Sequence, residues 1–112
     1  AKTYVEAVEG YMRSCNNALA LQYSNKLRER AYGNSTHNFT FINQDLLLDE
    51  QARELGQEGK RWEMLKRLNL LVDRVKLYNP TAGVNIQPYH VRWPIPRSFV
   101  QLTGFPQNEG YN

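Results

Sequence analysis

The chain has 112 residues, of which 41% are hydrophobic and 22% charged, with a formal net charge of +3. These values are ordinary for one globular domain with a modest core, and no apolar run approaches the roughly 20 residues of a transmembrane helix. The charge excess is small and acids are mixed among the bases, which favours a solvated helical surface over a dedicated anion-binding surface. The first residues enter a helical pattern without an initiator Met or a signal peptide, so we expect a fragment of a longer protein.

Two helices are predicted at the start of the chain from apolar residues at three- and four-residue spacing. The first stripe is Tyr4, Val8, Tyr11, Met12 and Cys15, and the second is Leu19, Tyr23, Leu27 and Ala31. Asn16-Asn17 breaks the pattern and can cap the second helix, which Gly33 ends. Helices joined by so short a turn should run antiparallel as a hairpin.

Cys15 is the only cysteine of the chain. One thiol cannot form an internal disulfide, and no Cys/His motif for zinc is present, so we predict no metal site. The spacing of Cys15 with the first apolar stripe leads us to expect a small buried residue.

A loop over residues 33–42 precedes a longer helical region. Apolar residues keep helical spacing from Leu48 to Val75, but Gly56 and Gly59 interrupt them, and each glycine costs a helix interior about 1 kcal/mol relative to Ala. We therefore expect a break there, a segment from about Lys60 to Asn69, and another to about Tyr78. Asn79-Pro80 should close the helical part.

Residues 79–112 form a tail of different composition, since all five prolines lie here and only Arg92, Arg97 and Glu109 are charged. Pro94 and Pro96 favour extended backbone at the residues before them. The aromatic and aliphatic area of this tail, at about 25 cal/mol per Å², should leave water. The predicted fold is therefore mostly α within a single domain over residues 1–112, in which helices to residue 78 carry an extended tail whose rings lie in grooves between them.

The densest polar cluster runs from Arg53 to Trp62. Glu54 and Glu58 are one helical turn apart and could serve as an acid/base pair in glycoside hydrolysis. The neighbouring cations Arg53, Lys60 and Arg61 favour ionised carboxylates, which suits an ion-pair network and disfavours a general acid. We therefore predict no catalytic residue here, while a carboxylate hydrolase stays an alternative.

Three other kinds of site find little support in the sequence. His37 and His90 lack a nucleophile or carboxylate at a recognisable motif spacing, and no glycine-rich phosphate loop occurs, so no cofactor is predicted. A rival hypothesis is a small basic module that binds nucleic acid through Lys66, Arg67, Arg74 and Lys76. This basic set has no interleaved aromatic residues, which weakens the nucleic-acid hypothesis. Trp62 and Trp93 could stack on a sugar, but burial is the commoner role of such rings.

Two segments carry a resemblance to a known family. Residues 52–67, ARELGQEGKRWEMLKR, resemble the family pattern "aREL-xxEG-xRW-xxL-xR". The stretch Trp93-Pro94-Ile95-Pro96, followed by QNEGY at 107–111, is similar to its "WPIP…QNPGY" ending, with Glu109 in place of the usual proline. Residues 27–31, LRERA, and 75–80, VKLYNP, also fit in order and spacing. Together these segments resemble the SusD/RagB family of nutrient-binding outer-membrane lipoproteins.

This resemblance implies a non-enzymatic protein with tetratricopeptide-like helical hairpins, without cofactor and without nucleic acid as a partner. Such proteins are lipid-anchored at the outer-membrane surface, act with a SusC-like TonB-dependent transporter, and capture glycans or, in some members, peptides. The chain would be a C-terminal portion, lacking the anchor and the N-terminal part against which it packs, so we expect an uncovered apolar face on residues 4–15.

The motif residues are expected to be architectural, and no ligand-binding residue is named. Charged hydrogen bonds from the cluster would hold the helices together, and the two tryptophans and the prolines would pin the tail. The residues to which the resemblance assigns this role are Arg53, Glu54, Glu58, Arg61, Trp62, Arg67, Trp93, Pro94 and Pro96.

Overall fold

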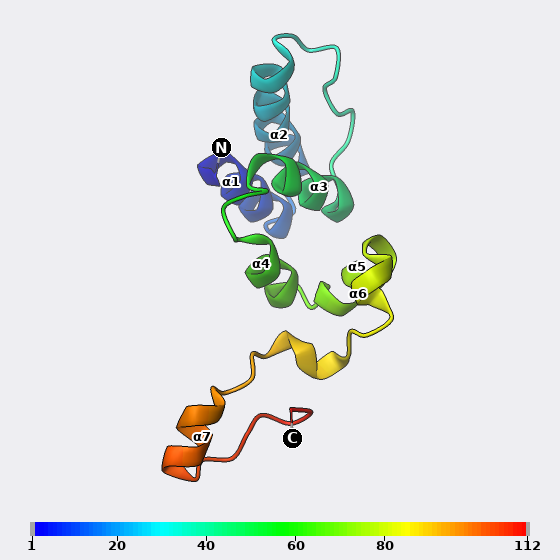
Figure 1. Cartoon of the computed structure of the whole chain (residues 1–112). Helices are drawn as coiled ribbons and strands as arrows, with labels where there is room; N and C mark the ends of the chain where they lie inside the picture. Colours follow the sequence, from blue (N-terminus) through cyan, green and yellow to red (C-terminus); the bar gives the residue numbers. More distant parts are fainter. Residues whose placement is uncertain (1, 112) are drawn as a thin grey trace. The chain divides into compact units, whose positions relative to one another are not determined.

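A computed structural model describes residues 2–111 of the chain (Figure 1). Within this range there are seven α-helices and one 3-10 helix, with no β-strand, which confirms a mostly helical fold. The elements are α1 (Lys2–Arg13), α2 (Asn17–Tyr32), α3 (Gln44–Glu54), α4 (Arg61–Arg67), α5 (Leu71–Tyr78), α6 (Pro80–Gly83), η1 (Pro88–Val91) and α7 (Arg97–Thr103). None of the helices in the described part is long and apolar enough to cross a bilayer.

The chain divides into two compact units, one ending at Arg61 and the other beginning at Trp62. We call them the first and the second unit. The division falls inside the part that the sequence predicts to be helical, and not at the composition change near residue 79. Each unit is described by itself below.

The ends of α2 and α3 lie where local sequence signals predict them. The Asn16 side chain accepts a hydrogen bond from the Leu19 backbone N–H (3.3 Å), which caps α2 as expected. Gly33 ends α2 in the left-handed region at φ 72°, and its N–H donates to the Glu29 carbonyl. Asn43 caps α3 through a bond from the Leu46 N–H (2.8 Å), so the predicted loop over 33–42 is confirmed.

Cys15 is exposed, which contradicts the prediction of a buried residue. Helix α1 ends in a Schellman motif, because the Cys15 N–H donates to the Met12 carbonyl (3.1 Å) and the Asn16 N–H to the Tyr11 carbonyl (2.8 Å). Cys15 therefore takes a left-handed conformation at φ 58°. It lies beyond the end of α1, so it does not continue the apolar stripe of that helix. The spacing of apolar residues could not reveal where this turn begins.

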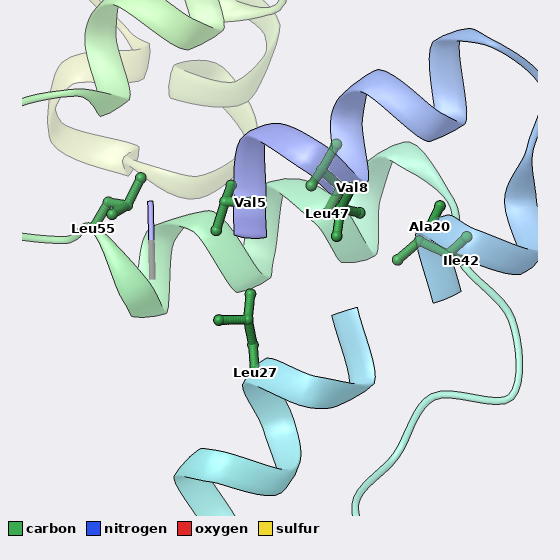
Figure 2. Close-up of a cluster of buried hydrophobic side chains, with 7 residues drawn as sticks. All are labelled: Val5, Val8, Ala20, Leu27, Ile42, Leu47 and Leu55. Atoms are coloured by element: carbon green, nitrogen blue, oxygen red, sulfur yellow. The ribbon is translucent and has the colours of Figure 1, made fainter. Parts of the chain in front are cut away.

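The core of the first unit is built by α1, α2 and α3 (Figure 2). The side chains shown there are all buried apolar residues: Val5, Val8, Ala20, Leu27, Ile42, Leu47 and Leu55. Helix α1 packs on both α2 and α3, and Val5 and Val8 are only 1% exposed. The expectation of an uncovered apolar face on residues 4–15 is therefore wrong for Val5 and Val8, which pack in the core with α2 and α3, while Tyr4 is 40% exposed.

The predicted break between α3 and α4 is confirmed, and it separates two residues that were expected to share a face. Helix α3 ends at Glu54, residues 55–60 form turns in which Gly59 has φ 68°, and α4 begins at Arg61. Glu58 lies exposed in these turns. Glu54 and Glu58 are consequently not on one helix, which removes the geometric basis of the acid/base pair.

The prediction of an extended tail over residues 79–112 is wrong for three stretches, α6, η1 and α7. Asn79 does not close the helical part: its side chain caps α6 by accepting from the Ala82 N–H (3.0 Å), with Pro80 at the first helical position. Of the tail, α6 and η1 pack on α5. Trp93 is 70% exposed, so its ring does not pin the tail into a groove between helices.

Candidate functional site

Three constellations of polar and aromatic side chains stand out: an ion-pair network in the first unit, and a groove and a backbone clamp in the second. The network centres on Glu50 of α3. Its carboxylate accepts from Arg28 Nη1 of α2 (3.0 Å) and from Arg53 Nη2 (2.9 Å). The side chains of Arg28 and Glu50 are 10% and 6% exposed, so this pair is nearly dry. A buried pair of this kind needs further hydrogen bonds to offset its desolvation.

Arg28 obtains those further contacts from the loop that connects α2 with α3. Its Nε donates to the His37 backbone carbonyl, and its guanidinium lies 4.1 Å from the centre of the Phe39 ring. The Asn25 side chain holds the same loop by a pair of bonds to the Phe39 backbone, donating to its carbonyl (3.0 Å) and accepting from its N–H (2.8 Å). One face of α2 thus fixes both the loop and α3.

A second arginine of α2 repeats this pattern one turn further along α3. Arg30 Nη2 is paired with Glu54. Arg28 and Arg30 therefore pair with two glutamates of α3 that are four residues apart, Glu50 and Glu54 respectively. Arg61 Nη1 donates to the Leu48 carbonyl of α3 (2.6 Å). This arrangement serves to join helices, because Glu50 and Glu54 face cations.

The remaining residues of the predicted cluster belong to the turns after α3 or to α4. Glu58 is exposed in the turns after α3, and Arg67 is exposed at the end of α4. Trp62 begins the second unit. Arg53, Glu54 and Arg61 each bond a residue of α2 or α3, and Glu58 lies in the turns between α3 and α4.

The groove of the second unit has a volume of about 330 Å³ and is open to the surface. Apolar side chains form most of its wall, with polar groups from two asparagines and a histidine: Trp62, Leu71, Val75, Asn79, Ala82, Asn85, Ile86 and His90. Grooves that combine aromatic walls with a few polar groups are the usual form of small-molecule sites. The structure therefore contains one candidate ligand groove whose wall includes a residue of the predicted cluster, Trp62.

Three contacts limit what the groove can hold. The ammonium of Lys66 lies 4.8 Å from the centre of the Trp62 ring and occupies one approach to it. The Trp93 ring lies 5.5 Å from that of Trp62 but is tilted by 53°, so the two do not form one flat platform. His90 Nδ1 accepts from the Gln87 N–H (2.7 Å), so this nitrogen is already engaged within η1. The groove thus suits an apolar group better than a polar ligand.

The clamp joins the stretch around Pro94 and Pro96 to the end of the described chain. The Gln107 side chain bonds both backbone groups of Ile95, accepting from its N–H (2.7 Å) and donating to its carbonyl (2.8 Å). Asn108 Nδ2 donates to the Trp93 carbonyl (2.7 Å), and the Tyr111 hydroxyl donates to the Arg92 carbonyl (2.6 Å). The two halves of the ending motif are therefore hydrogen-bonded to each other.

The clamp explains why the prolines and the two amides occur together. Pro94 and Pro96 lack a backbone donor and keep the residue between them extended. Ile95 then presents its N–H and its carbonyl to the carboxamide of Gln107. The sequence contained the signal, since both halves belong to the ending motif, but spacing alone assigned them to the helices instead of to each other.

The basic residues proposed to attract nucleic acid do not form one exposed face. Arg74 is 7% exposed, and its guanidinium lies 5.1 Å from the centre of the Tyr78 ring. Lys66 lies over Trp62. With two of the four cations engaged on aromatic rings, the structure does not support the rival hypothesis. Within residues 2–111, no group of three or more His, Cys, Asp or Glu side chains is placed to hold a metal ion.

Comparison with known proteins identifies two relatives. The chain is 34% identical over 110 residues to SusD-like protein P25 of Formosa agariphila, covering 91% of this chain and 21% of that protein. It is 30% identical over 116 residues to the starch-binding protein SusD of Bacteroides thetaiotaomicron, covering 99% of this chain and 20% of that protein. The chain thus spans about a fifth of the length of these curated relatives. No protein-family model and no solved structure matches the chain.

Proposed function

Because this chain is a distant homologue of SusD and SusD-like proteins over nearly its whole length, we propose that it is the C-terminal portion of a nutrient-binding protein of that family. The whole protein captures a glycan at the outer-membrane surface, where it is lipid-anchored. It hands the ligand to a SusC-like TonB-dependent transporter without cleaving it. The alignment with a starch-binding protein over 99% of the chain is the observation that carries this proposal.

Within such a protein the segment acts as scaffold. The paired arginines of α2 fasten α3 to the first hairpin, which in this proposal is a tetratricopeptide-like unit formed by α1 and α2. Stacked helical hairpins bury each apolar face against a neighbour, and their rigidity positions loops elsewhere for binding. Of the two carboxylates considered for catalysis, Glu54 joins α3 to α2 through Arg30 and Glu58 lies in the turns after α3, which agrees with a protein that binds and does not hydrolyse.

The test is glycan binding by the full-length gene product, first on a glycan array and then by titration calorimetry. We expect saturable binding to at least one polysaccharide, with no release of reducing ends during the experiment. Absence of binding to every glycan would reject the glycan ligand and leave a peptide as the nutrient class. Release of reducing ends that Glu54→Gln abolishes would restore the hydrolase alternative.

A variant of Trp93 tests whether this segment contacts the ligand. Trp93 is exposed and lies beside Trp62, so it is the ring most accessible for stacking. If the segment is scaffold, Trp93→Ala should change the dissociation constant by less than about threefold, whereas loss of a stacking ring costs more than about 1 kcal/mol, or roughly fivefold. A larger loss would assign ligand contact to this part of the chain.

A further inference from the structure

Helix α7 presents an apolar face to solvent. Phe99, Leu102 and the following Phe105 are 49%, 87% and 56% exposed, and the two phenylalanine rings contact each other edge to face at 6.4 Å. At 100° per residue, Phe99 and Leu102 lie on the same side of the helix. We call these three side chains the α7 face.

Burial within the described chain contributes little to the stability of α7, although the clamp on Ile95 joins the segments on either side of the helix. The helix has seven residues and buries none of them. Isolated helices of this length are marginal in water, because most helical stability in proteins comes from packing of an apolar face. Gly104 ends the helix in the left-handed region at φ 69°, so the element has a defined end but no packed side. Packing of its apolar side against another polypeptide surface would add the stability that burial does not supply here.

The tail that contains α7 has the composition of a surface that is covered. Of the chain beyond residue 79, only Arg92, Arg97 and Glu109 carry charge. The other large exposed apolar residues of the second unit are Leu77, Tyr78, Val84 and Trp93. Depletion of charge together with exposed aromatic residues is typical of the buried centre of an interface and unusual for a solvated surface.

We propose that the α7 face docks into an apolar groove of the remainder of its own polypeptide. The proposal uses only the part of the proposed function that places this chain within a longer protein, and it does not depend on the ligand. The relatives are about five times as long as the segment they share with this chain, so a covering surface of the required size is available in a protein of that length.

The small size of the face favours this occupant over a second copy of the chain. Three side chains present far less than the roughly 800 Å² per partner that a stable dimer buries. A covalently linked partner does not need that area, because attachment through the chain gives it a high effective concentration. A face too small to recruit a separate protein is large enough to dock within one polypeptide.

The test compares two variants of α7, each made in the full-length gene product and in the 112-residue chain. Leu102→Asp places a charge in the α7 face. Gln101→Asp adds the same charge on the opposite side of the same helix and serves as the matched control. Hydrogen exchange of the amides in residues 99–103 and the unfolding temperature are the readouts.

In the full-length protein we expect these amides to exchange at least about tenfold more slowly than in the 112-residue chain. Leu102→Asp should abolish that difference and lower the unfolding temperature, while Gln101→Asp should leave both unchanged. In the 112-residue chain neither variant should change the unfolding temperature.

Four outcomes would overturn the proposal. Equal exchange in the two proteins would mean that the face stays uncovered. Destabilisation of the 112-residue chain by Leu102→Asp would place the cover within that chain. Self-association that Leu102→Asp abolishes would identify a second copy, and loss of transporter co-purification at an unchanged unfolding temperature would identify the transporter. Glycan binding is measured separately, so its failure and the failure of docking are distinguishable.

Discussion

The two units of this chain are similar in length but differ in how much of their apolar surface is buried. All but two of the buried apolar residues in the described range lie in the first unit, and the exceptions are Leu65 and Leu71. The large exposed apolar residues are distributed the other way. The first unit has Tyr4, Tyr32 and Phe41, and the second has Leu77, Tyr78, Val84, Trp93, Phe99, Leu102 and Phe105.

The contrast shows two ways in which helices of this chain are stabilised. In the first unit α1–α3 enclose their own core, and charged hydrogen bonds from α2 set the position of α3. In the second unit order comes mainly from local bonds, such as the carboxamide clamp on Ile95, while much apolar surface remains outside. A self-contained unit tolerates isolation, whereas the other requires a neighbour to bury that surface.

Glu50→Ala should show the largest effect, because it leaves Arg28 in a nearly dry site without its counter-charge. Breaking a buried pair in this way costs about 3–5 kcal/mol, measured by denaturant unfolding of the 112-residue chain. The control is Glu6→Ala, whose exposed pair with Lys2 spans 3.8 Å and should contribute less than about 1 kcal/mol. Similar losses in the two variants would show that the Arg28 site is wetter than the structure indicates.

The same substitution at two leucines contrasts the units directly. Leu48 of α3 is fully buried and Leu102 of α7 is 87% exposed. Leu48→Ala should destabilise the chain by about 2–5 kcal/mol, and Leu102→Ala should stay within about 0.5 kcal/mol. A cost above about 1 kcal/mol for Leu102→Ala in the 112-residue chain would contradict the open character of the second unit.

Alanine substitutions at two glycines of the tail distinguish destabilisation by a steric clash from destabilisation by backbone strain. Both have positive φ, 88° at Gly110 and 69° at Gly104, but a Cβ at Gly110 would lie 2.3 Å from the Tyr89 ring while nothing lies within 4 Å at Gly104. Gly104→Ala should cost about 1 kcal/mol from backbone strain alone. Gly110→Ala should cost more, about 1–3 kcal/mol, and should loosen the clamp, seen as faster exchange of the Ile95 amide. Equal costs would mean that Tyr89 does not pack on Gly110.

Cys15 offers the smallest effect and the simplest readout. Its thiol is exposed and its backbone is left-handed at φ 58°. A thiol reagent should modify it in the folded chain at a rate within a few-fold of that in denaturant. Cys15→Gly should be neutral or stabilise by up to about 1 kcal/mol, since glycine relieves the left-handed strain. Protection of the thiol in the native chain would restore the prediction of a buried residue.

Local features of the sequence predict much of this fold. The asparagine before α2, the glycine after it and the glycine pair between α3 and α4 mark helix ends through hydrogen bonds and backbone angles that involve few neighbours. Periodicity placed the helices themselves. These signals need no knowledge of which helix packs on which.

Several of the errors share one cause, which is dependence on distant partners. Arg28 and Glu50 are 22 residues apart, and neither was singled out, since no short pattern connects them. Trp93 was expected to be buried because it is large and apolar, but whether such a ring finds a groove depends on packing that the tail does not encode locally. The clamp of Gln107 on Ile95 spans 12 residues and was missed for the same reason.

Hydrogen exchange of the 112-residue chain tests the central contrast most directly. The amides of α2 and α3 should exchange at least about 1,000-fold more slowly than those of α7, because the former open only with the core of the first unit. Equal protection in α3 and α7 would show that the second unit is as self-contained as the first, and the account of an uncovered α7 face would be wrong.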